Sequence, residues 1–450
     1  MKKISTDLTT GSLYKKIFLF SLPLIASNVL QVLFNMADVA VVGRFAGSIA
    51  LGCVGSTTTL VTMFTGFLIG LGSGVSALVA RRYGASDERG VVRTVHSAVV
   101  ICFAAGLFIF LFGEIFTDIL LSLLGTKEEL FGGASLYLRI YFIGMPAVAV
   151  FNFGSAVFSA VGETKKPLYF LAGAGVVNVV LNLVFVIGFG MSVAGVAVAT
   201  VISQYLSALL ITVSLIRSKG VFALRPSRIG SDRRTAAENL RLGIPSGLQF
   251  ALFQLANLFI QAGVNSFDHV MVEGNSAAAN SDGLVYDVMA AFYTACTSFM
   301  AQNYGAGKRD RVLKSYFISL LYSAGVGALL GCFIALWGKG FLGIFTADPA
   351  VAEAGLWRLR IMGLSYWVSA FMDCTIAASR GLGRSIMPTV MVVMGSVVFR
   401  IVWIYTVFAH FKTIPSLYLL YVFSWSITAV AEIIYFAVIY KKLMKSVTVD

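Results

Sequence analysis

The sequence predicts an all-α membrane protein with twelve transmembrane helices, arranged as two six-helix bundles related by a pseudo-twofold axis along the membrane normal. Three observations support this fold class: an apolar composition, a series of membrane-length apolar stretches and an internal repeat. The 450 residues are 58% hydrophobic and 12% charged, whereas soluble domains carry about a quarter charged residues. Soluble domains of this composition would lack polar surface, and the aromatic content of 13% excludes a disordered chain.

Twelve stretches of the chain are long and apolar enough to cross a hydrocarbon core of about 30 Å. The first follows a basic N-terminus and is too long for the apolar region of a signal peptide, so we expect it to be retained as a helix. The connections between the stretches are short and polar. The approximate ranges are 16–42, 50–80, 94–118, 136–161, 168–189, 193–216, 240–264, 279–302, 315–337, 355–379, 387–409 and 415–440.

The longest hydrophilic connection divides the chain near its middle. It runs over 217–240 and, together with Arg241, contains seven Lys and Arg residues. We therefore expect an N-terminal six-helix bundle over residues 1–220, a cytoplasmic linker over 221–239 and a C-terminal six-helix bundle over 240–450.

The formal net charge of +13 carries information about orientation. With twelve spans, 26 of the 34 Lys and Arg residues fall in the two termini and the loops on their side, and seven fall in the other loops. By the positive-inside rule both termini are cytoplasmic, in a multi-pass protein of the plasma membrane, here a bacterial inner membrane. The charge is therefore no indication of nucleic-acid binding.

An internal repeat relates the two halves of the sequence. Its landmarks keep a separation of 221 or 222 residues across the chain. Because each half has an even number of spans, both halves enter the membrane with the same topology, which is typical of transporters with a cavity between two bundles. The paired landmarks are Pro23 with Pro245, Asn35 with Asn257, Arg82 with Asn303, Gly162 with Gly383 and Pro167 with Pro388.

Polar residues follow one face of the first helix, and we call this face the first polar stripe. It consists of Asn28, Gln31, Asn35 and Asp38, spaced 3, 4 and 3 residues apart. Such a face cannot be exposed to lipid, so it lines either a hydrogen-bonded helix interface or a cavity. We favour a substrate cavity because Asp38 is ionisable at membrane depth.

The seventh helix carries a second polar stripe at the corresponding position. Gln254, Asn257, Gln261 and Asn265 are spaced 3, 4 and 4 residues apart. Two such stripes on equivalent helices are what a central aqueous cavity requires, and packing explains both together less readily.

Two further helices supply oxygen ligands of the same kind. Asn178 and Asn182 share a face of the fifth helix, and Thr200 lies in the sixth. A carboxylate with amide and hydroxyl oxygens suits Na⁺, or a proton held on the acid. The alternative is that both Asn residues serve helix packing.

Four charged residues fall inside spans of the second half. They are Asp287, Asp373, Arg400 and Glu432. Arg400 and Asp373 are the candidates for a buried ion pair that fixes packing, since an unpaired buried charge is costly. Asp287 and Asp373 are also candidates for the cavity.

Apolar and aromatic residues complete the expected cavity, and an organic cation would suit it through cation–π contacts and Asp38. Core packing is the commoner role for any one of these side chains. The candidates for the wall are Met36, Met63, Tyr141, Phe153, Met289, Tyr293 and Met300.

Several kinds of chemistry are missing from the sequence. There is no GxxxxGK[ST], no HExxH and no arguable Ser/His/Asp set, and Gly70–Gly74 fits close helix packing better than a phosphate loop. The five cysteines form no CxxC and are expected in the apolar core. We expect no enzyme activity and no cofactor, with transport driven by an H⁺ or Na⁺ gradient.

Short motifs in a fixed order resemble those of the multidrug and toxic-compound extrusion (MATE) family, within the oligosaccharidyl-lipid flippase superfamily. The resemblance covers essentially the whole chain. The motifs are Leu22-Pro23, Asn35-Met36-Ala37-Asp38 with Val42-Gly43-Arg44, Arg81-Arg82-Tyr83-Gly84-Ala85, Ala160-Val161-Gly162-Glu163-Thr164 with Pro167, and Arg380-Gly381-Leu382-Gly383-Arg384 with Pro388.

The resemblance implies roles for individual residues. In one branch of the family an acid on helix 1 couples to the ion, and Asp38 stands there; the accompanying positions match Asn178, Asn182 and Thr200. The second position on helix 5 is Asn182 here where family members have an acid, which removes one negative charge. Another branch uses acids on helices 7 and 10, but helix 7 has none here and Asp373 lies about a turn away. First-half coupling is therefore expected, with H⁺ and Na⁺ both open.

The expected function is a cation-coupled multidrug efflux antiporter that exports amphipathic, often cationic, organic compounds by alternating access. The alternatives are a flippase for lipid-linked precursors, a non-transporting scaffold or receptor, and a channel. A flippase would favour a cavity rich in Arg and Lys, whereas the spans hold one Arg and several acids. The expected partners are small organic cations or drugs and membrane lipid, without nucleic acid, and we expect a monomer.

Overall fold

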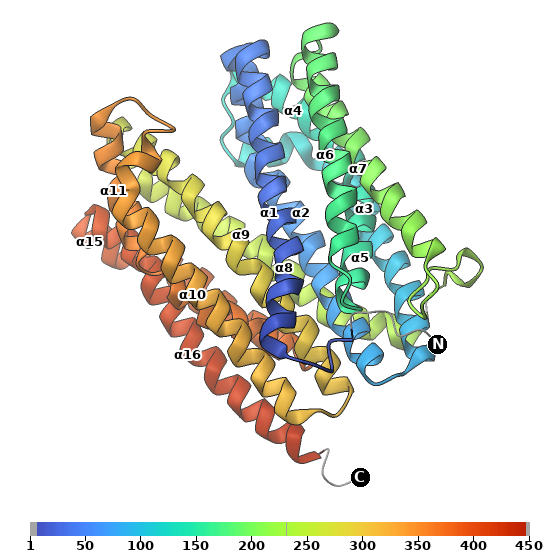
Figure 1. The fold of residues 1–450 in the computed structure, drawn as a ribbon. Helices are drawn as coiled ribbons and strands as arrows, with labels where there is room; N and C mark the ends of the chain where they lie inside the picture. Colours follow the sequence, from blue (N-terminus) through green and yellow to red (C-terminus); the bar gives the residue numbers. More distant parts are fainter. Residues whose placement is uncertain (1–6, 231, 447–450) are drawn as a thin grey trace. The chain divides into compact units, whose positions relative to one another are not determined.

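The structure is a computed structural model that describes residues 7–230 and 232–446, and every regular element in this part of the chain is a helix (Figure 1). This confirms the predicted all-α class. The elements are α1 Leu13–Val41, η1 Val42–Ala46, α2 Gly47–Gly84, α3 Glu88–Leu123, α4 Glu128–Ile143, α5 Met145–Ala160, α6 Lys165–Leu183, η2 Val184–Gly188, α7 Ser192–Arg217, η3 Pro226–Arg228, α8 Arg233–Val264, α9 His269–Gly305, α10 Arg309–Leu342, α11 Pro349–Gly363, α12 Tyr366–Gly381, α13 Ile386–Val392, η4 Val393–Val398, α14 Phe399–Trp403, η5 Ile404–Phe408, α15 Ala409–Phe411 and α16 Ile414–Ser446.

Nine helical stretches in the described residues are long and apolar enough to cross a membrane, or up to eleven when two bent helix pairs each count as one span. The twelve expected spans map onto them because one stretch, Leu13–Gly84, is 72 residues long and contains the first two. At 1.5 Å per residue this length exceeds a bilayer several-fold. Within it the chain leaves helical geometry at Gly47, whose φ of 89° is in the left-handed region that glycine tolerates.

The two bent pairs occupy corresponding places in the repeat. α4 and α5 meet at 46°, and so do α11 and α12. The expected spans 136–161 and 355–379 are therefore broken rather than straight, and the breaks fall around Gly144 and around Leu364 and Ser365.

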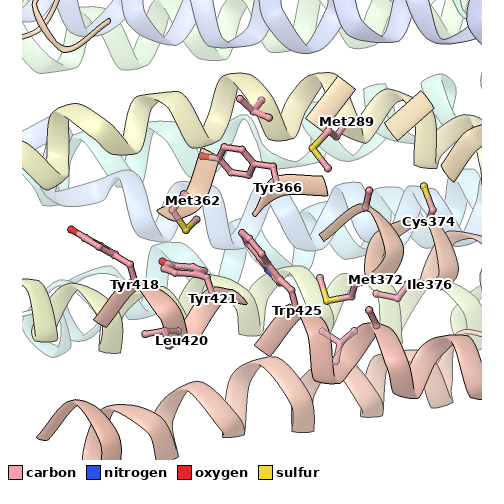
Figure 2. Close-up of a cluster of buried hydrophobic side chains, with 14 of the residues drawn as sticks. Met289, Met362, Tyr366, Met372, Cys374, Ile376, Tyr418, Leu420, Tyr421 and Trp425 are labelled. Carbon is pink, nitrogen blue, oxygen red and sulfur yellow. The ribbon is translucent and has the colours of Figure 1, made fainter. Parts of the chain in front are cut away.

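The chain divides into two compact units, each with its own core. Unit 1 contains Ala26–Ala251, and a core in it packs side chains of α2, α3, α4, α5 and α7 together with Val41, Val42 and Val186. Unit 2 contains Asp7–Ile25 and the chain from Leu252 onward, and its core is built from α9 to α16 (Figure 2). The unit boundaries fall inside α1 and α8, shortly after the internal prolines Pro23 and Pro245.

In each unit, residues at or near the equivalent loop of the repeat contact the beginning of a proline-containing helix or the segment before it. In unit 1, the Nη2 atom of Arg82 lies 2.5 Å from Oε2 of Glu238 near the start of α8, and its Nη1 donates to Thr94 at 2.6 Å. In unit 2, the corresponding loop anchors the chain before α1: Lys308 donates to the carbonyl oxygen of Thr9 at 2.8 Å.

Asp7 fixes the same N-terminal segment of unit 2. Its Oδ1 accepts hydrogen bonds from the backbone nitrogen and the hydroxyl of Thr9, at 2.8 and 2.7 Å. Burial acts to raise the pKa of this carboxyl, but the hydrogen bonds from Thr9 and Thr10 and the charge of Lys16 outweigh burial, so the pKa lies below its ordinary value.

The glycine-rich stretch of α2 allows close helix packing, as predicted. A Cβ atom added at Gly70 would lie 2.5 Å from the carbonyl oxygen of Ser246, and one at Gly74 would lie 2.5 Å from Cα of Gly243. Both neighbours belong to the backbone of α8, so side chains at these positions would force the helices of unit 1 apart.

The cysteines largely follow the prediction. Cys53, Cys102, Cys296 and Cys374 are buried, whereas Cys332 on α10 is exposed, so the expectation of a core position is wrong for Cys332. On a helix that passes through lipid, an apolar stripe can face outward as well as inward, and composition alone does not distinguish the two faces.

Candidate ion-coupling site

The structure of unit 1 brings together the four residues predicted for ion coupling, which we call the Asp38 cluster: Asp38, Asn178, Asn182 and Thr200. Nδ2 of Asn182 donates to Oδ1 of Asp38 and lies 3.3 Å from Oδ1 of Asn178. Thr200 Oγ1 lies 3.4 Å from Oδ2 of Asp38 and 3.4 Å from Nδ2 of Asn178. Three helices, α1, α6 and α7, supply the cluster.

The hydroxyl of Thr200 cannot satisfy every acceptor around it. Its single proton is closest to the carbonyl oxygen of Val196, at an oxygen–oxygen distance of 2.9 Å. When the proton is used there, the hydroxyl oxygen and Oδ2 of Asp38 face each other as two acceptors. A proton on Asp38 or a cation between the two oxygens would satisfy both.

A second unsatisfied acceptor lies in the same cluster. Oδ1 of Asn182 is buried without a hydrogen-bond partner among the described residues, and the whole side chain is inaccessible to solvent. Buried amide oxygens are normally paired. The carboxylate of Asp38 and the oxygens of Asn182 and Thr200 therefore form a set of hard ligands with unused capacity.

No basic side chain neutralises Asp38 in the part of the chain that the structure describes. The ion pairs of unit 1 link Arg82 and Arg234 to Glu238, and Arg139 to Glu114 and Asp118. An intramembrane carboxyl without a counter-ion must be protonated or bind a cation. Among the described residues no three His, Cys, Asp or Glu side chains form a metal-binding group, so a transition-metal site has no ligand set there.

Irregular helix geometry adjoins the Asp38 cluster on two of its helices. The π-helical turn η1 begins four residues after Asp38, and η2 begins two residues after Asn182. π-Helical turns inside helices are frequent at functional sites because they leave part of the hydrogen-bond ladder open to change. Both turns follow a residue of the cluster on its own helix.

The two polar stripes lie on accessible faces of their own units. In unit 1, Gln31 and Asn35 are exposed, and in unit 2, Asn257 and Asn265 are exposed. Within the second polar stripe, Nε2 of Gln261 donates to Oδ1 of Asn265 at 2.9 Å. Packing inside the units therefore does not bury either stripe completely. Asn28 and Gln254, the first residue of each stripe, are half-buried.

The remaining candidates for the cavity lie deeper. Tyr141 belongs to the core of unit 1 and stacks on Tyr137, with ring centroids 6.0 Å apart. Met289 is fully buried in the core of unit 2, beside Tyr366 in Figure 2, and Tyr293 packs against that core. Asp287 on α9 is half-buried.

The expected ion pair between Arg400 and Asp373 is absent from the described residues. Asp373 instead accepts a hydrogen bond from the hydroxyl of Tyr286 at 2.9 Å. The guanidinium of Arg400 lies over the ring of Tyr421, 4.6 Å from its centroid, and Nε donates to Ser424 at 3.2 Å. Aromatic and hydroxyl groups replaced the carboxylate that we expected as the partner of this buried cation.

A buried ion pair that the sequence did not predict exists in unit 2, between residues near the ends of the expected spans 279–302 and 355–379. Arg358 of α11 pairs with Asp282 of α9, and Asp282 also accepts from the hydroxyl of Tyr366. Nη1 of Arg358 donates to Oδ1 of Asn275 at 2.7 Å, and Tyr418 donates to the same oxygen at 2.9 Å. This network joins four helices, α9, α11, α12 and α16.

Glu432 on α16 is fully buried, and neither carboxyl oxygen has a hydrogen-bond partner among the described residues. The buried guanidinium of Arg380 is the charged group that interacts electrostatically with this carboxyl. The sequence marked Glu432 as an intramembrane acid but gave no indication of this neighbour.

Comparison with known proteins decides the family. The MatE family model matches residues 23–184 and, a second time, residues 245–406. The chain belongs to the MatE family. The two matches begin at Pro23 and Pro245, 222 residues apart, so the predicted repeat is confirmed and corresponds to two MatE domains.

Several known proteins resemble the chain over most of its length. The probable multidrug resistance protein YpnP of Bacillus subtilis (strain 168) is 30% identical over 360 residues, which cover 80% of each protein. The FAD transporter of Shewanella oneidensis is 25% identical over 71% of this chain and 72% of its own length. A MOP superfamily transporter from Pyrococcus furiosus has the same fold, with a TM-score of 0.92 at 21% identity, over 98% of this chain and 99% of that one.

Proposed function

We propose that this MatE protein is a cation-coupled efflux antiporter, driven by H⁺ or Na⁺, that exports amphipathic and often cationic organic compounds. The observation that carries the proposal is the Asp38 cluster, a carboxyl without a basic partner beside the buried amide oxygen of Asn182, which has no hydrogen-bond donor among the described residues. The similarity to a multidrug resistance protein supports the substrate class. The chain acts as a monomer in the plasma membrane, with both termini in the cytoplasm.

Ion binding at Asp38 is coupled to substrate release through helix α1. A proton or Na⁺ that enters from outside occupies the Asp38 cluster and changes the contacts of α1 with α6 and α7. α1 can respond because Pro23 interrupts its hydrogen-bond ladder and η1 follows the cluster. The first polar stripe lies on the same helix, so a change in α1 alters the surface that holds the substrate.

The substitution Asp38→Asn tests the proposal. It keeps the shape of the side chain and removes the negative charge, so coupled export should be lost while folding and membrane insertion remain. The measurement is dye and drug efflux from proteoliposomes, with Na⁺ and pH gradients imposed separately. Undiminished efflux by the folded variant would contradict the coupling role, and export that responds to neither gradient would contradict antiport.

The same vesicles distinguish substrate classes. The panel contains organic cations and neutral amphipathic drugs, together with FAD because one relative is an FAD transporter. Competition by organic cations against the dye supports the proposed class. Selective competition by FAD would make a dinucleotide transporter the better description.

A further inference from the structure

A pocket of about 390 Å³ lies in unit 1 where the first three turns of α3 meet the segment after α7. We call it the basic pocket because arginine dominates its polar lining. The side chains that matter here are Glu88, Arg89, Arg93 and His96 from α3, with Arg225 and Arg228 from the segment.

His96 builds this pocket by holding the segment against α3. The imidazole is buried, and its Nε2 accepts a hydrogen bond from the backbone nitrogen of Arg225 at 2.9 Å. The ring proton is then on Nδ1, which lies 2.7 Å from the carbonyl oxygen of Val92. Arg225 is therefore fixed opposite the arginines of α3 by its backbone, and its side chain remains exposed.

The protein offsets only part of the positive charge of the basic pocket. Arg89, Arg93, Arg225 and Arg228 are exposed, and none of them forms an ion pair within residues 7–230 or 232–446. Glu88 is the acidic residue in the lining. Asp232 attracts Arg93 electrostatically, but its carboxylate accepts a hydrogen bond from the Thr235 hydroxyl. Four guanidinium groups around one small volume favour an anion with several acceptor oxygens.

An apolar surface continues from the basic pocket along the same face of α3. Phe103 and Leu107 follow Arg89 by 14 and 18 residues, which are close to whole helical turns, and Leu111 follows Arg93 by 18. The exposed fractions of Phe103, Leu107 and Leu111 are 49%, 39% and 51%. Phe103 lies about 15 Å along the helix from Arg93, a depth of about half the hydrocarbon core.

We propose that the basic pocket binds the phosphate headgroup of an anionic phospholipid whose acyl chain lies along Phe103 and Leu107. The arginines match the phosphate, and the apolar stripe above them matches the tail. A free phosphate or a nucleotide would use the arginines but would gain nothing from the stripe. Basic pockets at the membrane interface are general sites for such headgroups. The proposal does not depend on which substrate the protein exports.

Native mass spectrometry of the full chain in detergent tests the proposal. The probes are phosphatidylglycerol and phosphatidylcholine with identical acyl chains, and we expect the protein to retain the anionic lipid preferentially. Each arginine near a membrane surface contributes about fivefold to such binding, equivalent to about 1 kcal/mol. The double variant Arg93→Gln/Arg225→Gln should therefore lower the preference about 25-fold.

Matched variants and competitors decide between the outcomes. Arg217→Gln removes an exposed arginine at the end of α7 that does not line the pocket, so it should leave the preference unchanged. If the double variant does not fold, Arg228→Gln on the exposed segment should lower the preference about fivefold on its own. An unchanged preference in folded pocket variants would overturn the proposal. Displacement of the lipid by millimolar inorganic phosphate or glycerol phosphate would also overturn it, because the pocket would then recognise a free anion.

Discussion

Adding a second carboxylate to the Asp38 cluster should convert it into a stronger cation site. In Asn182→Asp, a carboxylate oxygen replaces the amide nitrogen that now donates to Oδ1 of Asp38. The structure offers no basic side chain of unit 1 to offset the new charge within the described residues, because its ion pairs lie elsewhere. The two carboxylates must then share a proton or a monovalent cation.

The expected size of the effect follows from the contact between the two side chains. Unit charges about 4 Å apart interact by about 4 kcal/mol at an effective dielectric constant of about 20, and this is the added attraction for a shared cation. If desolvation of the new carboxylate offsets about half of this energy, about 2 kcal/mol remains, which corresponds to an affinity about thirtyfold higher. Na⁺ at the cluster also satisfies Oδ1 of Asn178 and the Thr200 hydroxyl oxygen.

The assay is substrate efflux from proteoliposomes at fixed pH, with the external Na⁺ concentration varied. The half-saturating Na⁺ concentration should fall about thirtyfold in Asn182→Asp relative to the unmodified protein. Asn152→Asp is the matched control: it adds the same carboxyl to α5, where the amide nitrogen donates to the carbonyl oxygen of Val148 at 2.9 Å. An unchanged Na⁺ dependence in folded Asn182→Asp, or an equal shift in Asn152→Asp, would refute the argument.

Three further substitutions test packing and charge, each by thermal unfolding in detergent. Gly74→Val should destabilise unit 1 by about 1–3 kcal/mol because its Cβ would meet the backbone of α8, whereas Gly55→Val on the same helix has open space and should be nearly neutral. Arg358→Leu leaves Asp282 without its ion-pair partner and should cost about 3–5 kcal/mol, part of which Asp282→Asn should restore in the double variant. Asp7→Asn should cost about 1 kcal/mol at neutral pH; because the folded pKa of Asp7 lies below the unfolded value of about 4, the difference should disappear as the pH falls below both.

Helical spacing and the family resemblance together pointed to the members of the Asp38 cluster, but they did not predict the contacts between them. Asp38 ends a stripe of polar residues, and Asn178 and Asn182 are one turn apart, so helical periodicity alone assigns each of them to a defined face. The structure shows which of these side chains contact one another, and it shows that Oδ1 of Asn182 has no hydrogen-bond partner among the described residues. Which face of α6 meets which face of α1 depends on tertiary packing, which periodicity does not encode.

The ion pair between Arg358 and Asp282 could not be predicted in the same way. Both residues lie near the beginning of an expected span, 279–302 or 355–379. Charged side chains at the ends of a span ordinarily face the aqueous loops, so hydropathy alone does not indicate that these two are buried. The structure extends α9 from His269 and bends α11 against α12, which carries Arg358 into the protein interior. A counter-ion 76 residues away in sequence has no local signature, so the sequence does not identify the two residues as partners.

The repeat gives the two halves equivalent positions, and their residues have diverged in charge. Ile260 stands where Asp38 does, at the separation of 222 residues that holds for Pro23 and Pro245, and Phe399 stands where Asn178 does, at the separation of 221 that holds for Pro167 and Pro388; Arg400 is the next residue. Arg400 is stacked on Tyr421 and bonded to Ser424 inside unit 2, so its charge is a permanent part of that unit. The second MatE domain thus carries a buried cation one residue after the position that corresponds to Asn178, whereas the first domain has the carboxyl of Asp38 in this region. Because Ile260 has no oxygen ligand at the position of Asp38, we propose that this place in the second MatE domain does not form an equivalent coupling site.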